Sequence, residues 1–171
     1  MRALHFAVLL APLAVGCRID LDHNEQGDDT TGRSCKVSTA TVCKDSETHS
    51  DFQWIESKIF VANCFGSSCH SDATSSGNRD LSKGHSYATL MGTNGDGVIA
   101  NLDPNHKLVV PGEPENSYLF FILKGVKATD SSPAHAEPPS DVGYMPMSNA
   151  TLCCQKIDAI ERWITAGAMN D

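Results

Sequence analysis

The stretch DFQWIESKIFVANCFGSSCH, residues 51–70, decides how this chain folds. Asp51 can cap a helix, because its carboxylate can accept a hydrogen bond from a backbone N–H of the first turn. The apolar residues that follow recur at helical spacing, and they predict a helix that runs up to Cys64. These apolar residues are Phe52, Ile55, Ile59 and Ala62.

A second amphipathic helix is predicted near the end of the chain, where Gly167 terminates it. Its apolar residues are Ile157, Ile160, Trp163 and Ile164, and we expect them to pack against the first helix. Shorter helices are expected around 85–91 and from Pro114 through Leu123, and the proline-rich segment 129–143 is expected to be a loop. Because no stretch alternates like a strand, the sequence predicts one small all-α domain over residues 51–171.

The cysteines and the histidine in CFGSSCH, residues 64–70, suit covalent haem attachment. Cys64 and Cys69 would form the thioethers, and His70 would become an axial iron ligand. The usual attachment motif has two residues between its cysteines, whereas this segment has four. Two alternatives remain open: a small Cys64–Cys69 disulfide loop, and zinc held by both thiols, His70 and a further thiol.

The N-terminus predicts export and a lipid anchor. Residues 1–16 carry a positive start and a short apolar run, too short to span a bilayer, so they are interpreted as a cleaved signal peptide. Leu13-Ala14-Val15-Gly16-Cys17 resembles the lipobox of bacterial lipoproteins, in which the cysteine is lipidated. Residues 17–50 would then hold the lipid anchor, a polar linker and a disulfide loop from Cys35 to Cys43. This places the protein in the bacterial cell envelope, on the periplasmic or outer surface.

Export also accounts for the chain's seven cysteines, which are natural in an oxidising compartment. With Cys17 lipidated and two thiols in the haem segment, four remain to form two disulfides: Cys35, Cys43, Cys153 and Cys154. The same count also allows three disulfides and no haem. A bond between the adjacent cysteines of the last helix would be strained, so at least one bridge should join the N-terminal segment to that helix.

The net charge of −8 excludes nucleic acid as an expected partner and favours a basic protein partner. Three histidines outside the haem segment, His85, His106 and His135, are interpreted as solvated residues rather than ligands.

Five segments together resemble the planctomycete-type cytochrome c domains of secreted proteins and lipoproteins, over roughly residues 52–169. In chain order they are the helix at Ile55–Ala62 leading into the cysteines, Asp80-Leu81-Ser82 with Tyr87-Ala88-Thr89-Leu90, Val110-Pro111-Gly112-Glu113-Pro114-Glu115-Asn116-Ser117-Tyr118-Leu119, Met145-Pro146, and the helix Ile160–Ala168.

The resemblance implies one covalent haem c, with His70 as the proximal ligand and Met145 as the distal ligand. Met147 lies near enough in sequence to compete with Met145. With both axial positions filled by protein, the iron would carry electrons to a redox partner rather than catalyse a reaction, so no enzyme activity is expected. The alternative function is a haem-free, disulfide-stabilised lipoprotein that keeps the fold as a binding or structural module.

Overall fold

The computed structural model describes residues 35–66, 69–71, 76–147 and 152–171. Over these ranges the chain is helical, and its only β-type pairings are three isolated bridges. This agrees with the prediction of helices without strands. The helices are α1 Thr41–Ser46, α2 Phe52–Ile55, η1 Glu56–Cys64, η2 Ser76–Asn78, α3 Ser86–Met91, η3 Pro114–Asn116, α4 Tyr118–Lys124, η4 Ala128–Asp130 and α5 Cys154–Thr165.

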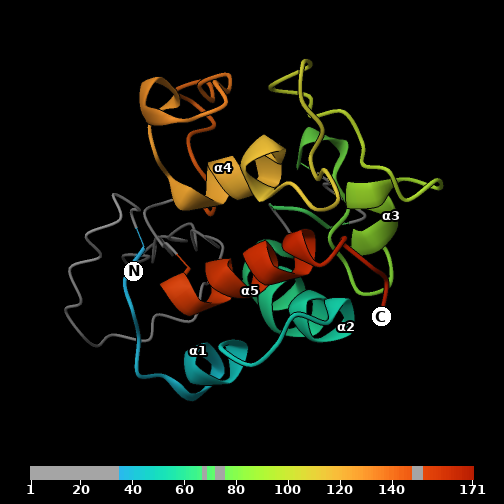
Figure 1. The fold of residues 1–171 in the computed structure, drawn as a ribbon, viewed down its shortest axis with the longest axis vertical. Helices are drawn as coiled ribbons and strands as arrows, with labels where there is room; N and C mark the ends of the chain where they lie inside the picture. The colour runs from blue at the N-terminus through green and yellow to red at the C-terminus, as the bar shows by residue number, and fades with distance from the viewer. Residues whose placement is uncertain (1–34, 67–68, 72–75, 148–151) are drawn as a thin grey trace, which may run out of the picture.

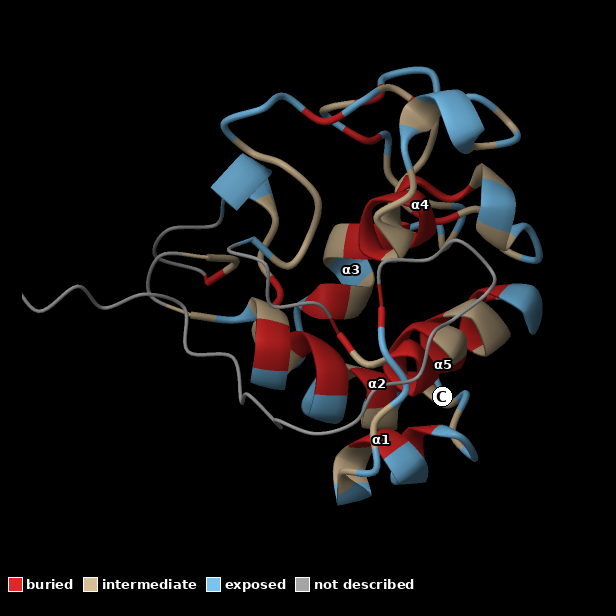
Figure 2. Ribbon diagram, turned by 90° about the vertical axis from the view of Figure 1, so that its left-hand side faces the viewer, coloured by how far each residue is buried: buried red, intermediate tan, exposed pale blue. Residues whose placement is uncertain are grey.

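Helix α5 runs through the middle of the molecule, with α4 on one side and α1 and α2 on the other (Figure 1). Its predicted apolar face is confirmed: Ile157, Ile160, Trp163 and Ile164 are all buried. Figure 2 shows buried residues along α2, α4 and α5, whereas the outer turns and loops are largely exposed. Burial of this face against several partners stabilises α5 far more than its intrinsic helix propensity does.

The predicted helix after Asp51 is present, and its cap is confirmed. The Asp51 carboxylate accepts a hydrogen bond of 2.9 Å from the Trp54 N–H. After one α-helical turn, however, the helix continues as the wider π-helix η1. The expectation that Ala62 faces the core is therefore wrong: Ala62 is exposed, and Asn63 is buried instead. A π-helix has more residues per turn, so the inward position moves along the sequence.

The helix predicted from Pro114 is divided in two. Pro114 begins the short 3-10 helix η3, and α4 starts only at Tyr118, after the extended residue Ser117. The Ser117 hydroxyl donates to the Glu113 carbonyl and accepts from the Val110 N–H, both at 2.9 Å. These bonds hold the bend between the two helices and explain the break.

Two disulfides join the N-terminal segment to the start of α5, as predicted. They link Cys35 to Cys154 and Cys43 to Cys153. The expectation of a loop closed by a bond between Cys35 and Cys43 is wrong, because both sulfurs reach α5 instead. These bridges and the packing of α1 on α5 extend the packed structure to the N-terminal side of residue 51.

Residues 125–147, after α4, are mostly loop, as predicted, and cover one end of α4. Its main-chain link to α4 is a hydrogen bond of 3.2 Å from the Met145 N–H to the Ile122 carbonyl. Within the described ranges, no helix has both the length and the apolar character needed to cross a membrane.

Candidate functional site

The imidazole of His70 is held by the backbone of the segment that follows it. Its Nδ1 lies 3.2 Å from the Arg79 carbonyl oxygen, which can only accept, so Nδ1 carries the proton and donates. A neutral ring then keeps its lone pair on Nε2. Burial lowers the pKa of His70 and outweighs the hydrogen bonds to backbone carbonyls, which favour the charged ring. His70 is therefore a neutral imidazole of fixed tautomer, the form that binds a metal.

Main-chain hydrogen bonds hold Cys64 and His70 close together. The His70 N–H donates to the Cys64 carbonyl at 3.1 Å, and the Leu81 N–H donates to the His70 carbonyl at 2.8 Å. Leu81 is buried in the core, so this bond ties the histidine to the packed part of the molecule. The end of η1 and the histidine thus form one continuous site.

The Cys64 sulfur is a free thiol that packs against the core. Burial raises its pKa to about 12, although the positive charge of Lys156 opposes the shift. The thiol is therefore protonated near neutral pH, and it is not bonded to Cys69. Cys69 is itself disulfide-bonded. The small loop closed by Cys64 and Cys69, one of the sequence alternatives, is thus absent.

The two candidate distal methionines differ in exposure. Met145 is partly buried against the core, whereas Met147 is 48% exposed. No described contact joins either of them to His70. The lipidation candidate Cys17, the signal peptide and the linker lie outside the described residues.

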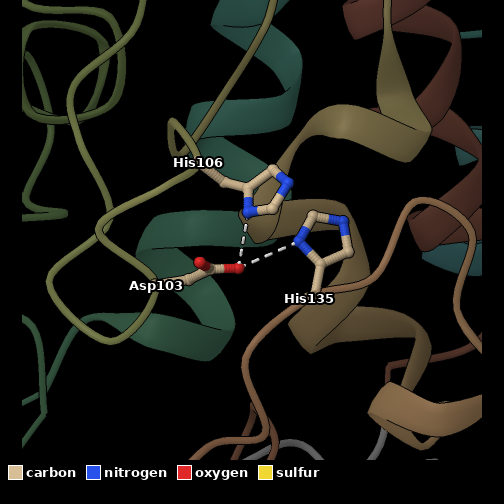
Figure 3. Close-up of side chains that lie close together, drawn as sticks. All are labelled: Asp103, His106 and His135. Atoms are coloured by element: carbon tan, nitrogen blue, oxygen red, sulfur yellow. Dashed lines mark hydrogen bonds and ion pairs between the residues drawn. The ribbon is translucent and has the colours of Figure 1, made fainter.

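A second cluster of polar side chains is formed by Asp103, His106 and His135 (Figure 3), and it lies beside α4, because the His135 ring packs on Tyr118 and Phe121. Asp103 and His106 come from a turn within the segment between α3 and η3, and His135 comes from the loop that follows η4. The Asp103 Oδ2 lies 2.8 Å from His106 Nδ1 and 3.2 Å from His135 Nδ1. The expectation of solvated histidines is wrong for His135, whose side chain is 1% exposed, and His106 is only 20% exposed.

Burial by itself raises the pKa of Asp103, but the Ala136 N–H and the two imidazoles outweigh it, so this pKa lies below its ordinary value. The carboxylate is therefore ionised in the interior of the protein. Sequence reasoning missed this cluster because its histidines are far apart in the chain. The only local signal is the spacing of Asp103 and His106, three residues apart within one turn.

Comparisons with protein-family models, with curated proteins and with solved structures give no match for this chain. The residues and their geometry therefore carry the functional argument.

Proposed function

We propose that this protein is a membrane-tethered monohaem c-type cytochrome that carries electrons outside the cytoplasm. The hydrogen bond from His70 Nδ1 to the Arg79 carbonyl carries the proposal. It fixes the ring orientation and leaves Nε2 as the ligand nitrogen, as second-shell hydrogen bonds do for histidines that bind metals. A haem held here would supply a one-electron iron couple.

Cys64 and Cys69 would hold the haem through thioethers. The two long-range bridges use four other cysteines of the described chain, and Cys64 is a free thiol. Cys69 is disulfide-bonded in this structure, so attachment there requires a dithiol reductant outside this chain to reduce that bond to the thiol first. Because the Cys64 thiol is buried and protonated after folding, attachment should precede the final packing of η1.

Met145 would be the distal ligand. Its packing against the core, in contrast to the exposed Met147, favours it as the residue that can be held in a fixed position. A thioether ligand opposite an imidazole raises the reduction potential of a haem.

The rest of the proposal is a cytochrome c-like all-α domain over residues 51–171, a lipid anchor at Cys17, and a basic redox partner that matches the net charge of −8.

The second candidate is a haem-free lipoprotein that serves as a binding or structural module. The disulfide at Cys69 and the protonated, buried thiol of Cys64 favour it, because neither sulfur is then available for a thioether. The two candidates differ in one measurable property, which is the presence of covalent haem.

The deciding experiment produces the full chain together with c-type haem maturation proteins. The cytochrome proposal expects the intact mass of one chain plus one haem, a low-spin visible spectrum, and haem staining that survives a denaturing gel. A chain that lacks haem, or whose Cys64 is found in a disulfide after haem-replete expression, would support the haem-free module instead.

Ligand variants then test the individual residues. His70→Ala should abolish low-spin ligation, and Met145→Ala should remove the sulfur-to-iron absorption band, lower the potential and leave the haem attached. Met147→Ala is the matched control and should leave the spectrum unchanged. If Met147→Ala removes the band, the distal ligand is Met147.

A further inference from the structure

In the buried cluster of Asp103, His106 and His135, the protein's own groups do not satisfy all the hydrogen-bonding atoms, and this is the problem that the cluster presents. His135 Nε2 lies 2.8 Å from the Glu115 carbonyl oxygen, which can only accept, so Nε2 carries a proton and donates to it. In a neutral ring the lone pair is then on Nδ1, which points at the Asp103 carboxylate from 3.2 Å. Two lone pairs facing each other repel, so a cation is required between them.

A proton on His135 Nδ1 would solve only part of this problem. His106 Nδ1 lies 2.8 Å from the same carboxylate oxygen and has no hydrogen-bond partner. Among the described residues, the buried side-chain polar atoms without a hydrogen-bond partner are His106 Nδ1 and Tyr118 Oη. Both belong to this region, since the Tyr118 and His135 rings lie 6.0 Å apart. A proton shared by Asp103 and His135 leaves His106 Nδ1 without a partner, at a cost typical of buried polar groups.

We propose that Asp103, His106 and His135 bind one divalent transition-metal ion, and that this ion is Zn²⁺. Two imidazoles and one carboxylate are a ligand set that zinc uses in proteins. The inference is independent of the proposed haem, because it uses none of the residues of the segment 64–70.

The distances between the ligand atoms fit a single ion. Ligand atoms about 2.1 Å from one ion, at octahedral to tetrahedral angles, lie about 3.0–3.4 Å from one another. The two measured distances to Asp103 Oδ2 are 2.8 and 3.2 Å, and the candidate ligand atoms all lie within 4.8 Å of one another. Only small side-chain movements are needed to place an ion among them.

The surroundings hold the ligands in place before an ion binds. The Asp103 N–H donates to the Ala100 carbonyl and the His106 N–H to the Asp103 carbonyl, which fixes the turn that carries both ligands. The Ala136 N–H donates to Asp103 Oδ2 at 3.0 Å, and the Phe121 ring stacks on His135 at 4.6 Å. The ion would therefore fasten the loop after η4 to the turn that carries Asp103 and His106, and it would stabilise their arrangement.

Zinc binding to the metal-free, haem-free full chain tests the proposal directly. We expect one Zn²⁺ per chain by elemental analysis after dialysis, together with a rise in thermal midpoint with zinc concentration. Co²⁺ in place of zinc should give visible absorption bands of a site with nitrogen and oxygen ligands. Each measurement is repeated in Cys64→Ser, which removes the free thiol of the other candidate site.

Variants of the ligands separate this site from adventitious binding. His106→Ala and Asp103→Asn should weaken zinc at least about 100-fold, because even loss of a second-shell partner costs 10–100-fold. His85→Ala is the matched control: His85 pairs with Asp80 at 3.2 Å, but its side chain is 66% exposed, and zinc affinity should not change. Tyr118→Phe should also keep zinc, because burial raises the pKa of this phenol to about 12 and it stays protonated.

Four results would overturn the inference. The first is a chain that binds no zinc, and the second is unchanged affinity in both His106→Ala and Asp103→Asn. The third is a nitrogen NMR spectrum that shows His135 protonated on both ring nitrogens with zinc present, because the cluster would then be an ion pair only. Loss of zinc in Cys64→Ser would also overturn it, by assigning the metal to the cysteine segment.

Discussion

At the scale of single residues, the hydrogen bond from His70 to the Arg79 carbonyl sets both the tautomer and the orientation of the imidazole. The sequence indicates the chemistry of His70 through its place after Cys69, but not this partner nine residues away. Because burial lowers the pKa of His70, the folded protein prefers the neutral ring.

We expect the haem-free protein to lose stability as the pH falls below the ordinary histidine pKa of about 6.5. Between the lowered folded pKa and the unfolded pKa, the unfolded chain binds more protons, so stability rises with pH in this window. Urea unfolding at a series of pH values measures the slope. In His70→Gln the slope between pH 5 and 7 should be smaller, and identical slopes in both proteins would contradict the assignment.

At Gly97, the backbone conformation and the neighbouring main chain leave no room for a side chain. Its φ is +89°, and a Cβ added there would lie 1.9 Å from the Val109 carbonyl oxygen. Gly97→Ala should therefore cost about 2–5 kcal/mol, the sum of the left-handed strain and a backbone displacement.

Gly84→Ala is the control for this prediction. Gly84 has a similar φ of +85°, but nothing lies within 4 Å of an added Cβ. Only the conformational strain remains there, so the cost should be about 1–2 kcal/mol. Equal losses of unfolding free energy in the two variants would show that the contact with Val109 is not what constrains Gly97.

At the scale of elements, the short helix α1 depends on α5 for its position. Arg162 of α5 donates a hydrogen bond of 2.9 Å to the His49 carbonyl, just after α1. The Gln155 side chain makes two bonds to the Ser38 backbone, of 2.8 and 3.1 Å, just before α1. With the two disulfides, these contacts fix both sides of α1, which by itself is too short to be stable in water.

Removal of the first of the two disulfides should lower the free energy of unfolding less than removal of the second. They span 119 and 110 residues and lie next to each other, so either one closes nearly the same large loop. Removal of the Cys43–Cys153 bridge alone, by Cys43→Ser with Cys153→Ser, should lower the free energy of unfolding by about 3 kcal/mol. With the Cys35–Cys154 bridge still present, the lost bond had closed a ring of only about ten residues. Removal of the second bridge as well should cost about 5 kcal/mol more, because the large loop then opens.

Denaturant unfolding of the variants that lack one or both of these two bridges measures the costs. The variant without the Cys35–Cys154 bridge is the matched control and should resemble the one without Cys43–Cys153. Equal, additive losses would show that strain or denatured-state structure, rather than loop closure, determines the effect.

At the scale of the whole molecule, a packed helical domain would be joined to a membrane by the segment before residue 35. We expect the mature protein to begin at Cys17 and to partition with membranes, because multiple acyl chains give a stable anchor. Cys17→Ser should leave the protein in the soluble fraction or unprocessed. Membrane fractionation with intact mass measures this outcome, and wild-type protein that is soluble and free of acyl mass would contradict it.

The sequence by itself determined the elements that depend on local physics. The Asp51 cap, the apolar face of α5 and the proline-rich loop follow from hydrogen bonding to the next few residues, from periodicity and from fixed backbone angles. The division of four cysteines into two bridges also followed, because adjacent cysteines cannot pair without strain.

Only the tertiary structure decided the rest, because those features depend on residues far apart in the chain. The π-helical turns of η1 moved Asn63 into the core, where its side chain accepts a hydrogen bond from Lys156 of α5. The burial of His135 against Asp103 results from a loop that folds back over α4 from 32 residues away. Periodicity and motif spacing carry no information about such contacts, since packing between distant segments sets their geometry and their electrostatics.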